Sequence, residues 1–324
     1  MTKRIPISNS LGVDHSLEMM RHISLEGEDT IIVALNFRCN SKCRFCIIEH
    51  EIEERLEHVD IRVFEELFRF NHSERQFTRL TISGAEATLR TDLVDIVQRA
   101  VRDGGFETIR IQTNGRRLAK RTYAKSLVDA GLNEYFVSVH GADQEHDAYI
   151  TRDRASFDQM REGIGNLLEL GARVITNTVV CAENAHRLVD IANLLGLMGV
   201  REAQFWNFLE IGDVGQKDSL VRVTESIPHL RRAIQVLLAQ EIEVTVKWFP
   251  RCLLGEYGEH LNNHQPQMLI QDEFQNRLSH NFGFRCAHQA ICGHFGNGCD
   301  GLHERYHEVF GDEAEHLRPK TESQ

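Results

Sequence analysis

Short apolar segments alternate with longer amphipathic ones from residue 30 to residue 208, and this alternation constrains the fold more than any other feature. The short segments are four to eight residues long and rich in β-branched and aromatic side chains. They predict strands at residues 30–37, 80–83, 108–112, 135–140, 174–180 and 202–208. Leucine and isoleucine recur at helical spacing in the longer segments, which predict helices at residues 61–71, 92–102, 119–130, 156–170 and 185–195.

Strands that alternate with helices in this way predict parallel βαβ units with right-handed crossovers. Six such units predict an α/β fold with a partial (β/α)6 TIM-type barrel. An open doubly wound sheet is the less favoured alternative. Both architectures bind ligands at the carboxyl ends of their strands, so we expect functional residues directly after the strands.

The pattern changes after Val221. A further helix (227–240) and a further strand (243–248) are followed by Pro250, several glycines, many histidines and most of the remaining cysteines. This change predicts a small module appended to the barrel. We expect an N-terminal extension at residues 1–30, the core barrel at residues 31–240, and the C-terminal module with its tail at residues 241–324.

The charge balance restricts the partners of the chain. Lys and Arg total 37 and Asp and Glu total 48, a formal net charge of −11, which argues against nucleic acid as a partner. The sequence has neither an apolar run of 18 residues nor a secretory signal. We therefore expect neither a membrane-spanning helix nor export. We expect a cytoplasmic protein.

Eight cysteines are the chemically informative residues. A cytosol keeps thiols reduced, so clustered cysteines favour metal ligation over disulfides. Cys39, Cys43 and Cys46 follow the first predicted strand with the spacing C-x3-C-x2-C. Three thiolates cannot complete a tetrahedral zinc site without a fourth ligand, but they can hold three irons of a [4Fe–4S] cluster and leave one iron open. A zinc knuckle or scattered core thiols are the alternatives.

The triplet, its place after the first strand, and the aromatic Phe45 before its last cysteine resemble the radical S-adenosylmethionine (SAM) superfamily. In that family the open iron chelates the amino and carboxylate groups of SAM. Reduction of the cluster then cleaves SAM to a 5′-deoxyadenosyl radical, which abstracts a hydrogen atom from the substrate. The resemblance therefore implies SAM and a catalytic [4Fe–4S] cluster as cofactors, with Phe45 beside SAM.

The segment after the second predicted strand is similar to the G-G-E-P motif of the family. Gly84 and Glu86 match this motif, whereas Ala85 and Ala87 depart from it. The resemblance implies that Gly84 and Glu86 contact SAM, and that the Glu86 carboxylate binds the SAM amino group. A solvated glutamate in a turn is the alternative.

Three later strands end in further motifs that resemble the family. Thr113 and Asn114 belong to a T-N-G sequence after the third strand, and Ser138 ends the fourth. The resemblance implies that Thr113 and Asn114 bond polar groups of SAM and that Ser138 faces its ribose. Asn177 on the fifth strand is a further cofactor-binding candidate, and His140 either approaches SAM or substrate or is structural.

The C-terminal cysteines are similar in layout to the auxiliary-cluster modules of radical SAM enzymes, the twitch and SPASM types. Their number fits the one-cluster twitch type, so the resemblance implies an auxiliary [4Fe–4S] cluster held by Cys252, Cys286, Cys292 and Cys299. Two alternatives remain open. One is a zinc site that includes His288 or His294. The other is an open auxiliary cluster with three protein ligands that binds substrate directly.

Cys181 is the one cysteine that belongs to neither group. It follows the fifth predicted strand and is expected to face the pocket. There it could return a hydrogen atom to a substrate radical, as in radical epimerases. The alternative is a small buried hydrophobic side chain.

Together these features predict a radical SAM enzyme of the oxidoreductase or isomerase type. We expect it to oxidise or epimerise a small natural-product or sugar-like substrate, with help from the auxiliary cluster and electrons from a flavodoxin- or ferredoxin-type protein. A ribosomal-peptide maturase is the alternative; the roughly 30 residues before the first strand are short for a leader-binding domain. A non-catalytic iron–sulfur electron carrier or sensor is the alternative of another class, and the altered G-A-E-A motif is its support.

Overall fold

A curved, nine-stranded parallel sheet organises the chain in the computed structural model, which describes residues 5–7, 29–48, 59–211, 218–271, 274 and 283–321. In chain order its strands are β1 (Ile5–Ile7), β2 (Thr30–Ala34), β3 (Arg79–Ser83), β4 (Thr108–Thr113), β5 (Glu134–Ser138), β6 (Arg173–Val180), β7 (Glu202–Asn207), β8 (Glu243–Lys247) and β9 (Gln267–Gln271). From β2 to β7 each strand pairs in parallel with the next along the chain. The predicted partial (β/α)6 barrel is therefore confirmed.

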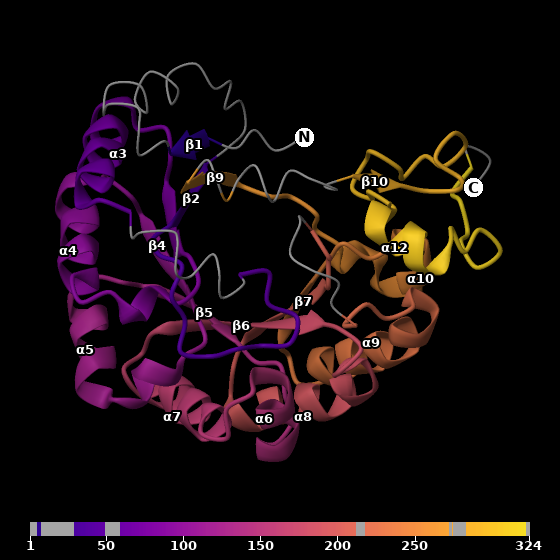
Figure 1. The fold of residues 1–324 in the computed structure, drawn as a ribbon, viewed down its shortest axis with the longest axis horizontal. Coiled ribbons are helices and arrows are strands. Elements are labelled where there is room, and N and C mark those ends of the chain that lie inside the picture. The colour runs from indigo at the N-terminus through magenta and orange to yellow at the C-terminus, as the bar shows by residue number, and fades with distance from the viewer. Residues whose placement is uncertain are drawn as a thin grey trace.

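Three further strands extend this six-stranded core. β8 pairs with β7, whereas β9 pairs with β2 on the opposite side, and β1 pairs with β9. The chain between β8 and β9 thus crosses from one side of the partial barrel to the other (Figure 1). The expected boundary between residues 240 and 241 falls just before β8, so two strands beyond it belong to the same sheet as the barrel.

The helices cover the outer, convex side of the sheet (Figure 1). They are α3 (Ile61–Glu74), α4 (Leu93–Asp103), α5 (Arg121–Asp129), α6 (Gln144–Thr151), α7 (Ser156–Glu169), α8 (Leu188–Met198) and α9 (Val223–Leu238), with 3-10 turns η1 (Ala87–Leu89), η2 (Arg116–Ala119) and η3 (Ala185–Arg187). α6 was not predicted. It begins where the Asp143 side chain accepts a hydrogen bond from the His146 backbone N–H, as N-cap aspartates do.

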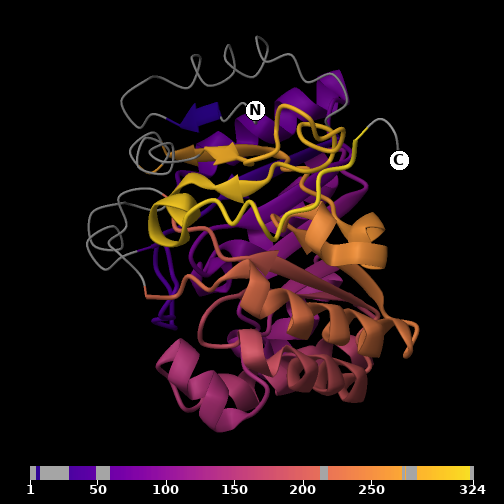
Figure 2. The ribbon, with the colours of Figure 1, turned by 90° about the vertical axis from the view of Figure 1, so that its right-hand side faces the viewer.

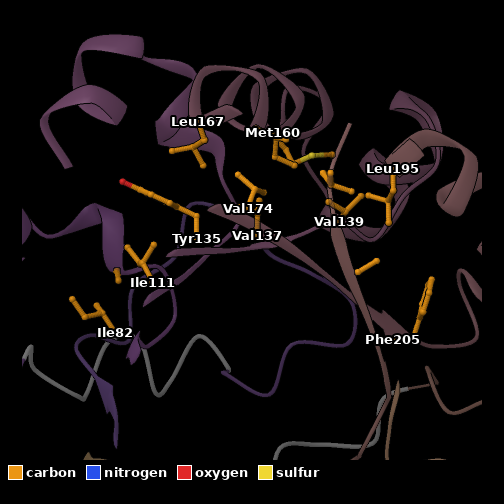
Figure 3. Packing of buried hydrophobic residues seen from close by; sticks show 14 of the residues in the cluster. Ile82, Ile111, Tyr135, Val137, Val139, Met160, Leu167, Val174, Leu195 and Phe205 are labelled. Carbon is orange, nitrogen blue, oxygen red and sulfur yellow. The ribbon is translucent and has the colours of Figure 1, made fainter. Parts of the chain in front are cut away.

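The hydrophobic core lies between the sheet and these helices. Alternate residues of each strand point outward into it, for example Ile82, Ile111 and Tyr135, all fully buried. They pack beneath side chains from the helices, such as Leu167 of α7 and Leu195 of α8 (Figure 3). The intervening strand positions point into the barrel lumen, and many of these are polar.

The C-terminal segment forms a small hairpin and helix beside the barrel (Figure 2). β10 (Phe284–Arg285) pairs antiparallel with β11 (Leu302–His303), and α12 (Glu304–Phe310) follows. Before it, α10 (Arg251–Leu254) and η4 (Gly255–His260) follow β8. Cys299, Leu302 and Tyr306 are buried in the same hydrophobic cluster as the barrel. Within the described residues, no helix combines the length and apolar character needed to cross a bilayer.

Candidate active site

A cavity of about 220 Å³ opens at the carboxyl ends of the strands, where the sequence predicts function. Its wall combines the loop after β2 with the ends of β3 to β7. Nine of the predicted site residues line it: Cys39, Cys43, Phe45, Cys46, Gly84, Thr113, Asn114, Ser138 and Asn177. Side chains that are far apart in the chain thus meet around one space.

The three N-terminal thiols lie together on the loop after β2, which we call the cluster loop (Cys39–Cys46). Burial and the nearby Cys46 and Cys39 thiolates raise the pKa of Cys43 well above its ordinary value. The Cys39 sulfur accepts a hydrogen bond from the Ser41 N–H at 3.3 Å, and the Cys46 sulfur accepts one from the Ile48 N–H at 3.4 Å. Three gathered thiols with N–H donors to sulfur fit the ligation of an iron–sulfur cluster, whose potential such bonds tune.

Arg116 ties the cluster loop to the barrel from η2, directly after β4. The residue is 9% exposed. It donates to the Asn40 carbonyl and to Ser41 Oγ, and on its other side to Gln159 Oε1 and Asp153 Oδ2 at 2.8 and 2.7 Å. Arg116 therefore bridges the cluster loop and α7. Our reading of the sequence did not select Arg116, although it directly follows the T-N-G motif.

α6 holds the other side of the cluster loop. The Lys42 and Arg44 N–H groups donate to the carbonyls of Thr151 and Ile150 at 3.1 and 3.0 Å. These carbonyls belong to the last turn of α6, whose acceptors have no partner within the helix. The Arg44 guanidinium also stacks on the Tyr149 ring at 4.0 Å. The unpredicted helix thus fixes the loop that carries the three thiols.

Glu86 is fully buried, so the alternative of a solvated glutamate is wrong. Its carboxylate accepts hydrogen bonds from the Thr88 N–H and hydroxyl, from Thr113 Oγ1 at 2.7 Å and from the Asn114 N–H at 2.7 Å. It is not among the residues that line the cavity. Glu86 therefore joins the loop after β3 to the turn after β4, and its binding of the SAM amino group stays a prediction.

The backbone explains which parts of the G-A-E-A segment must be glycine. Gly84 has φ 131°, and a Cβ there would lie 2.6 Å from the Asn36 carbonyl oxygen. Ala85 has no positive φ, and its N–H donates to the same Asn36 carbonyl at 2.9 Å. An alanine at position 85 is thus compatible with this loop, and its departure from the family pattern does not disturb the backbone.

Asn114 reaches from the turn after β4 to the cluster loop. Its side-chain amide donates to Asn40 Oδ1 at 2.7 Å and lies 3.8 Å from the Cys39 sulfur. Gly115 follows with φ 76°, and a Cβ there would lie 2.8 Å from Val137. The turn therefore requires glycine, and it aims the asparagine at the first thiol.

Ser138 and Asn177 lie side by side in the sheet, as Cα partners of β5 and β6. The Asn177 Oδ1 atom is buried and has no hydrogen-bond partner within the described residues. A buried acceptor without a partner is costly, so this atom suits a ligand that brings an N–H or O–H donor. The cavity wall therefore fits a polar cofactor such as SAM.

His140 forms part of the same wall. It is buried, and burial lowers its pKa to about 4, so the ring is neutral at pH 7. Its Nδ1 accepts the Val179 N–H at 3.3 Å, and its ring meets that of Phe45 edge to face at 4.8 Å. Trp206 also lines the cavity.

Asp147 is a further wall residue that our reading of the sequence did not assign. Its carboxylate accepts the Ser156 hydroxyl, and burial raises its pKa. Its position after the fourth predicted strand is a sequence feature that could have indicated a site residue. Only the tertiary structure shows that α6 turns its side chain inward.

Cys181 is fully buried directly after β6 and is not among the residues that line the cavity. Burial and the nearby Glu183 raise the pKa of its thiol well above the ordinary value. The expectation that it faces the pocket is therefore not met by this arrangement. Its role as a hydrogen-atom donor stays a prediction.

The four C-terminal cysteines gather at the start of α10 and in the segment from β10 to β11. Burial raises the pKa of Cys252, and the nearby thiolates of Cys299, Cys286 and Cys292 raise it further. The four thiols are therefore neighbours. The Cys299 sulfur accepts the Arg251 N–H at 3.5 Å.

The histidines of this segment were expected in one zinc alternative. His288 bonds the Ala314 carbonyl through Nε2 at 3.0 Å. No three Cys, His, Asp or Glu side chains in the described ranges are arranged to hold a single metal ion. The choice between an iron–sulfur cluster and a zinc site at these cysteines stays a prediction.

Comparison with known proteins agrees with this geometry. The sequence pattern of the Radical SAM superfamily matches residues 33–195, half of the chain. GTP 3′,8-cyclase of Aquifex aeolicus is 28% identical over 57% of this chain and 58% of its own length. PqqA peptide cyclase of Methylorubrum populi is 26% identical over 73% of this chain and 63% of its own. The chain thus spans less than two thirds of these relatives.

Solved structures show the same fold. Streptococcus suis SuiB bound to S-adenosylmethionine superimposes with a TM-score of 0.64 over 95% of this chain and 80% of that one, at 13% identity. HydG, a maturase of the [FeFe]-hydrogenase, superimposes with a TM-score of 0.54 at 13% identity. With the matched superfamily pattern, the thiol-bearing loop after β2 and the partial barrel, the chain belongs to the radical SAM superfamily.

Proposed function

We propose that this chain cleaves SAM reductively and uses the product to abstract a hydrogen atom from a substrate carbon. The observation that carries the proposal is the meeting of three cluster-loop thiols with the ends of β3 to β7 around one cavity. When bound there, a reduced [4Fe–4S] cluster would supply the electron that cleaves SAM to the 5′-deoxyadenosyl radical. Cys39, Cys43 and Cys46 would hold it, as their gathered thiols and N–H···S bonds support.

The other residues of the cavity would bind SAM and exclude water. Asn177 Oδ1, a buried acceptor with no partner in the described part of the chain, would receive a donor from SAM, and Ser138 would bond its ribose. Thr113 and Asn114 are fixed by the Glu86 carboxylate, so Glu86 would also shape the SAM site indirectly. Phe45 and Gly84 would complete the contact surface.

Anaerobic reconstitution with iron, sulfide, SAM and dithionite tests this proposal. Formation of 5′-deoxyadenosine that is lost in the Cys39→Ala, Cys43→Ala, Cys46→Ala triple variant is expected. Absence of 5′-deoxyadenosine from the reconstituted wild type would overturn the enzymatic proposal and favour an electron carrier or sensor. A flavodoxin- or ferredoxin-type reductant is proposed to replace dithionite in the cell.

A second, auxiliary [4Fe–4S] cluster is proposed at Cys252, Cys286, Cys292 and Cys299. The mutual effect of these thiols on the pKa of Cys252 supports it. Two cubane clusters correspond to about eight irons per chain, and the triple cluster-loop variant should retain about half. If Cys286→Ala leaves the iron content unchanged, this ligand set is wrong.

The reaction that follows hydrogen abstraction is proposed to be oxidation or epimerisation of a small natural-product or sugar-like substrate. Maturation of a ribosomal peptide is the second candidate, and the similarity to PqqA peptide cyclase favours it. Candidate substrates with deuterium at single positions separate the two. Transfer of the label from a small molecule, or from a peptide, into 5′-deoxyadenosine identifies the class.

A further inference from the structure

A second cavity, of about 290 Å³, lies inside the barrel lumen below the candidate active site. We call it the lumen cavity. Inward-facing side chains of the strands form its wall, among them Thr81, Arg110, Gln112, Gln204, Trp206 and Lys247. Residues of the crossing segment before β9 close one side. Gln112 and Trp206 line both cavities, so the two cavities adjoin at these side chains.

Lys247, the last residue of β8, places a buried cation in this wall. The residue is 8% exposed. Its Nζ donates to the His264 carbonyl and lies 5.2 and 5.8 Å from the ring centres of Trp206 and Trp248. These contacts are to a neutral oxygen and to aromatic faces. In the described part of the chain Lys247 forms no ion pair, which is unusual because buried charges are generally paired.

The other charges that line or flank the lumen cavity are compensated. Glu134 pairs with Arg110 and, at 3.2 Å, with Arg173. Arg173 also pairs with Glu202 at 2.9 Å. Lys247 therefore carries positive charge that no carboxylate of the described residues neutralises. Burial and the nearby Arg110 cation lower the pKa of Lys247 from 10.5 to about 8, so the amine still carries its proton in most molecules at pH 7.

A second polar group of the lumen cavity has no hydrogen-bond partner among the described residues. The Oε1 atom of Gln265 is buried and accepts no hydrogen bond from the described residues, and Gln265 lines the same cavity. An ammonium without a counter-charge and an acceptor without a donor are both costly in a protein interior. A ligand with an anionic group and a nearby N–H or O–H donor would satisfy both.

We propose that the lumen cavity is a binding site for an anionic group, a carboxylate or a phosphate, with Lys247 as its cation and Gln265 as acceptor for a neighbouring donor. Because this cavity adjoins the active site at Gln112 and Trp206, the anion belongs to the substrate and anchors it beneath SAM. The Trp206 indole is held by its Nε1–H bond to Gln204 Oε1 at 3.0 Å and forms the fixed wall past which the substrate extends. That the ligand is the substrate rests on the proposed function; that the site binds an anion does not.

Isothermal titration at pH 7 with succinate and with inorganic phosphate tests the site on the intact protein. At least one of the two should bind wild type with one site per chain. Lys247→Met should weaken that binding at least tenfold, and Lys247→Arg should restore most of it. Lys125→Met is the matched control, because Lys125 is exposed and paired with Asp129 on α5, and it should bind as wild type does.

The outcomes separate the sources of the anion. Binding of succinate alone indicates a carboxylate, and binding of phosphate alone a phosphate ester. If neither anion binds wild type, or if Lys247→Met binds as tightly as Lys125→Met, the proposal is overturned. Lys247→Gln replaces Lys247→Met if the latter does not fold, as judged by circular dichroism. SAM cleavage is measured separately on wild type, so its failure would overturn the proposed function while the titration still decides on the anion site.

Discussion

Glu86 and Lys247 are two buried ionisable residues of the partial barrel, and they are satisfied to very different degrees. The Glu86 carboxylate receives donors from Thr88, Thr113 and Asn114, whereas the Lys247 ammonium has one backbone acceptor among the described residues. Buried polar groups stabilise a fold only when their partners are present. The first residue is therefore expected to stabilise the protein and the second to destabilise it in the absence of a ligand.

We predict that Lys247→Met raises the free energy of unfolding at pH 7 by on the order of 2 kcal/mol. The folded-state pKa of Lys247 is lowered to about 8, so the unfolded chain binds more protons between about pH 8 and pH 10.5. The penalty for the buried charge is therefore fully present below pH 8 and disappears as the pH rises through this window. Urea unfolding of both proteins should show their difference shrinking from pH 7 to pH 10. A less stable variant at pH 7 would contradict the prediction.

Glu86→Ala is predicted to have the opposite effect. It leaves the Thr113 hydroxyl and the Asn114 N–H buried without an acceptor, and such groups cost about 1–3 kcal/mol each. We expect the free energy of unfolding of the cluster-free protein to fall by about 3 kcal/mol. Glu107→Ala, at an exposed position, is the control and should unfold as wild type does. Equal stability of the Glu86 variant would show that the carboxylate does not hold these two loops together.

At the scale of elements, the sequence predicts what lies on the outer face of the sheet. All six expected strands of the core are present, because Ile82, Ile111 and Tyr135 pack on helices and leave a regular apolar pattern. α6 escaped prediction because it is short and carries few apolar residues. β9 escaped because its pairing with β2 joins distant parts of the chain, and no local pattern records that register.

The candidate site likewise has residues that the sequence predicts and residues that it does not predict. The three cluster-loop thiols could be predicted because their spacing and their place after β2 are local properties of the sequence. Sequence spacing could not predict the roles of Arg116 and Asp147 or the direction in which the Cys181 side chain points. These depend on how α6, α7 and the end of β6 are oriented in three dimensions. The spacing of cysteines in the sequence therefore predicts the metal ligands, whereas the residues that hold those ligands in place are known only from the tertiary structure.

The cluster loop itself should depend on the η2 arginine. Arg116→Ala removes the donors to the Asn40 carbonyl and to Ser41 and leaves the Asp153 carboxylate without its cation. We expect the reconstituted variant to lose iron from the N-terminal site, so that iron per chain falls towards the content of the triple cysteine variant. Arg121→Ala is the matched control, because Arg121 is half-exposed and paired with Glu169. Full iron retention in the Arg116 variant would refute this role.

At the scale of the whole molecule, the C-terminal module and the barrel share one core. Tyr306 of α12 is 2% exposed and belongs to the same hydrophobic cluster as the barrel strands. Its hydroxyl accepts the Val223 N–H at 2.8 Å and donates to Glu313 at 2.7 Å, and Glu313 pairs with Arg222 at 3.0 Å. The start of α9 is thus bound to the module by a buried polar network, and we expect the two parts to unfold together.

Tyr306→Phe tests this cooperativity because it deletes one buried hydroxyl and keeps the ring. Loss of its partners should cost about 1–3 kcal/mol, and the cost should appear in the barrel although the change lies in the module. Trp206 lies in β7 and Trp248 directly follows β8, so the fluorescence of these tryptophans reports on the barrel. In urea, fluorescence and far-UV circular dichroism should shift together to a lower midpoint. Tyr149→Phe, at a residue 53% exposed, should leave both midpoints unchanged. If the fluorescence midpoint of the Tyr306 variant stays at the wild-type value, the module unfolds by itself and the shared core does not couple it to the barrel.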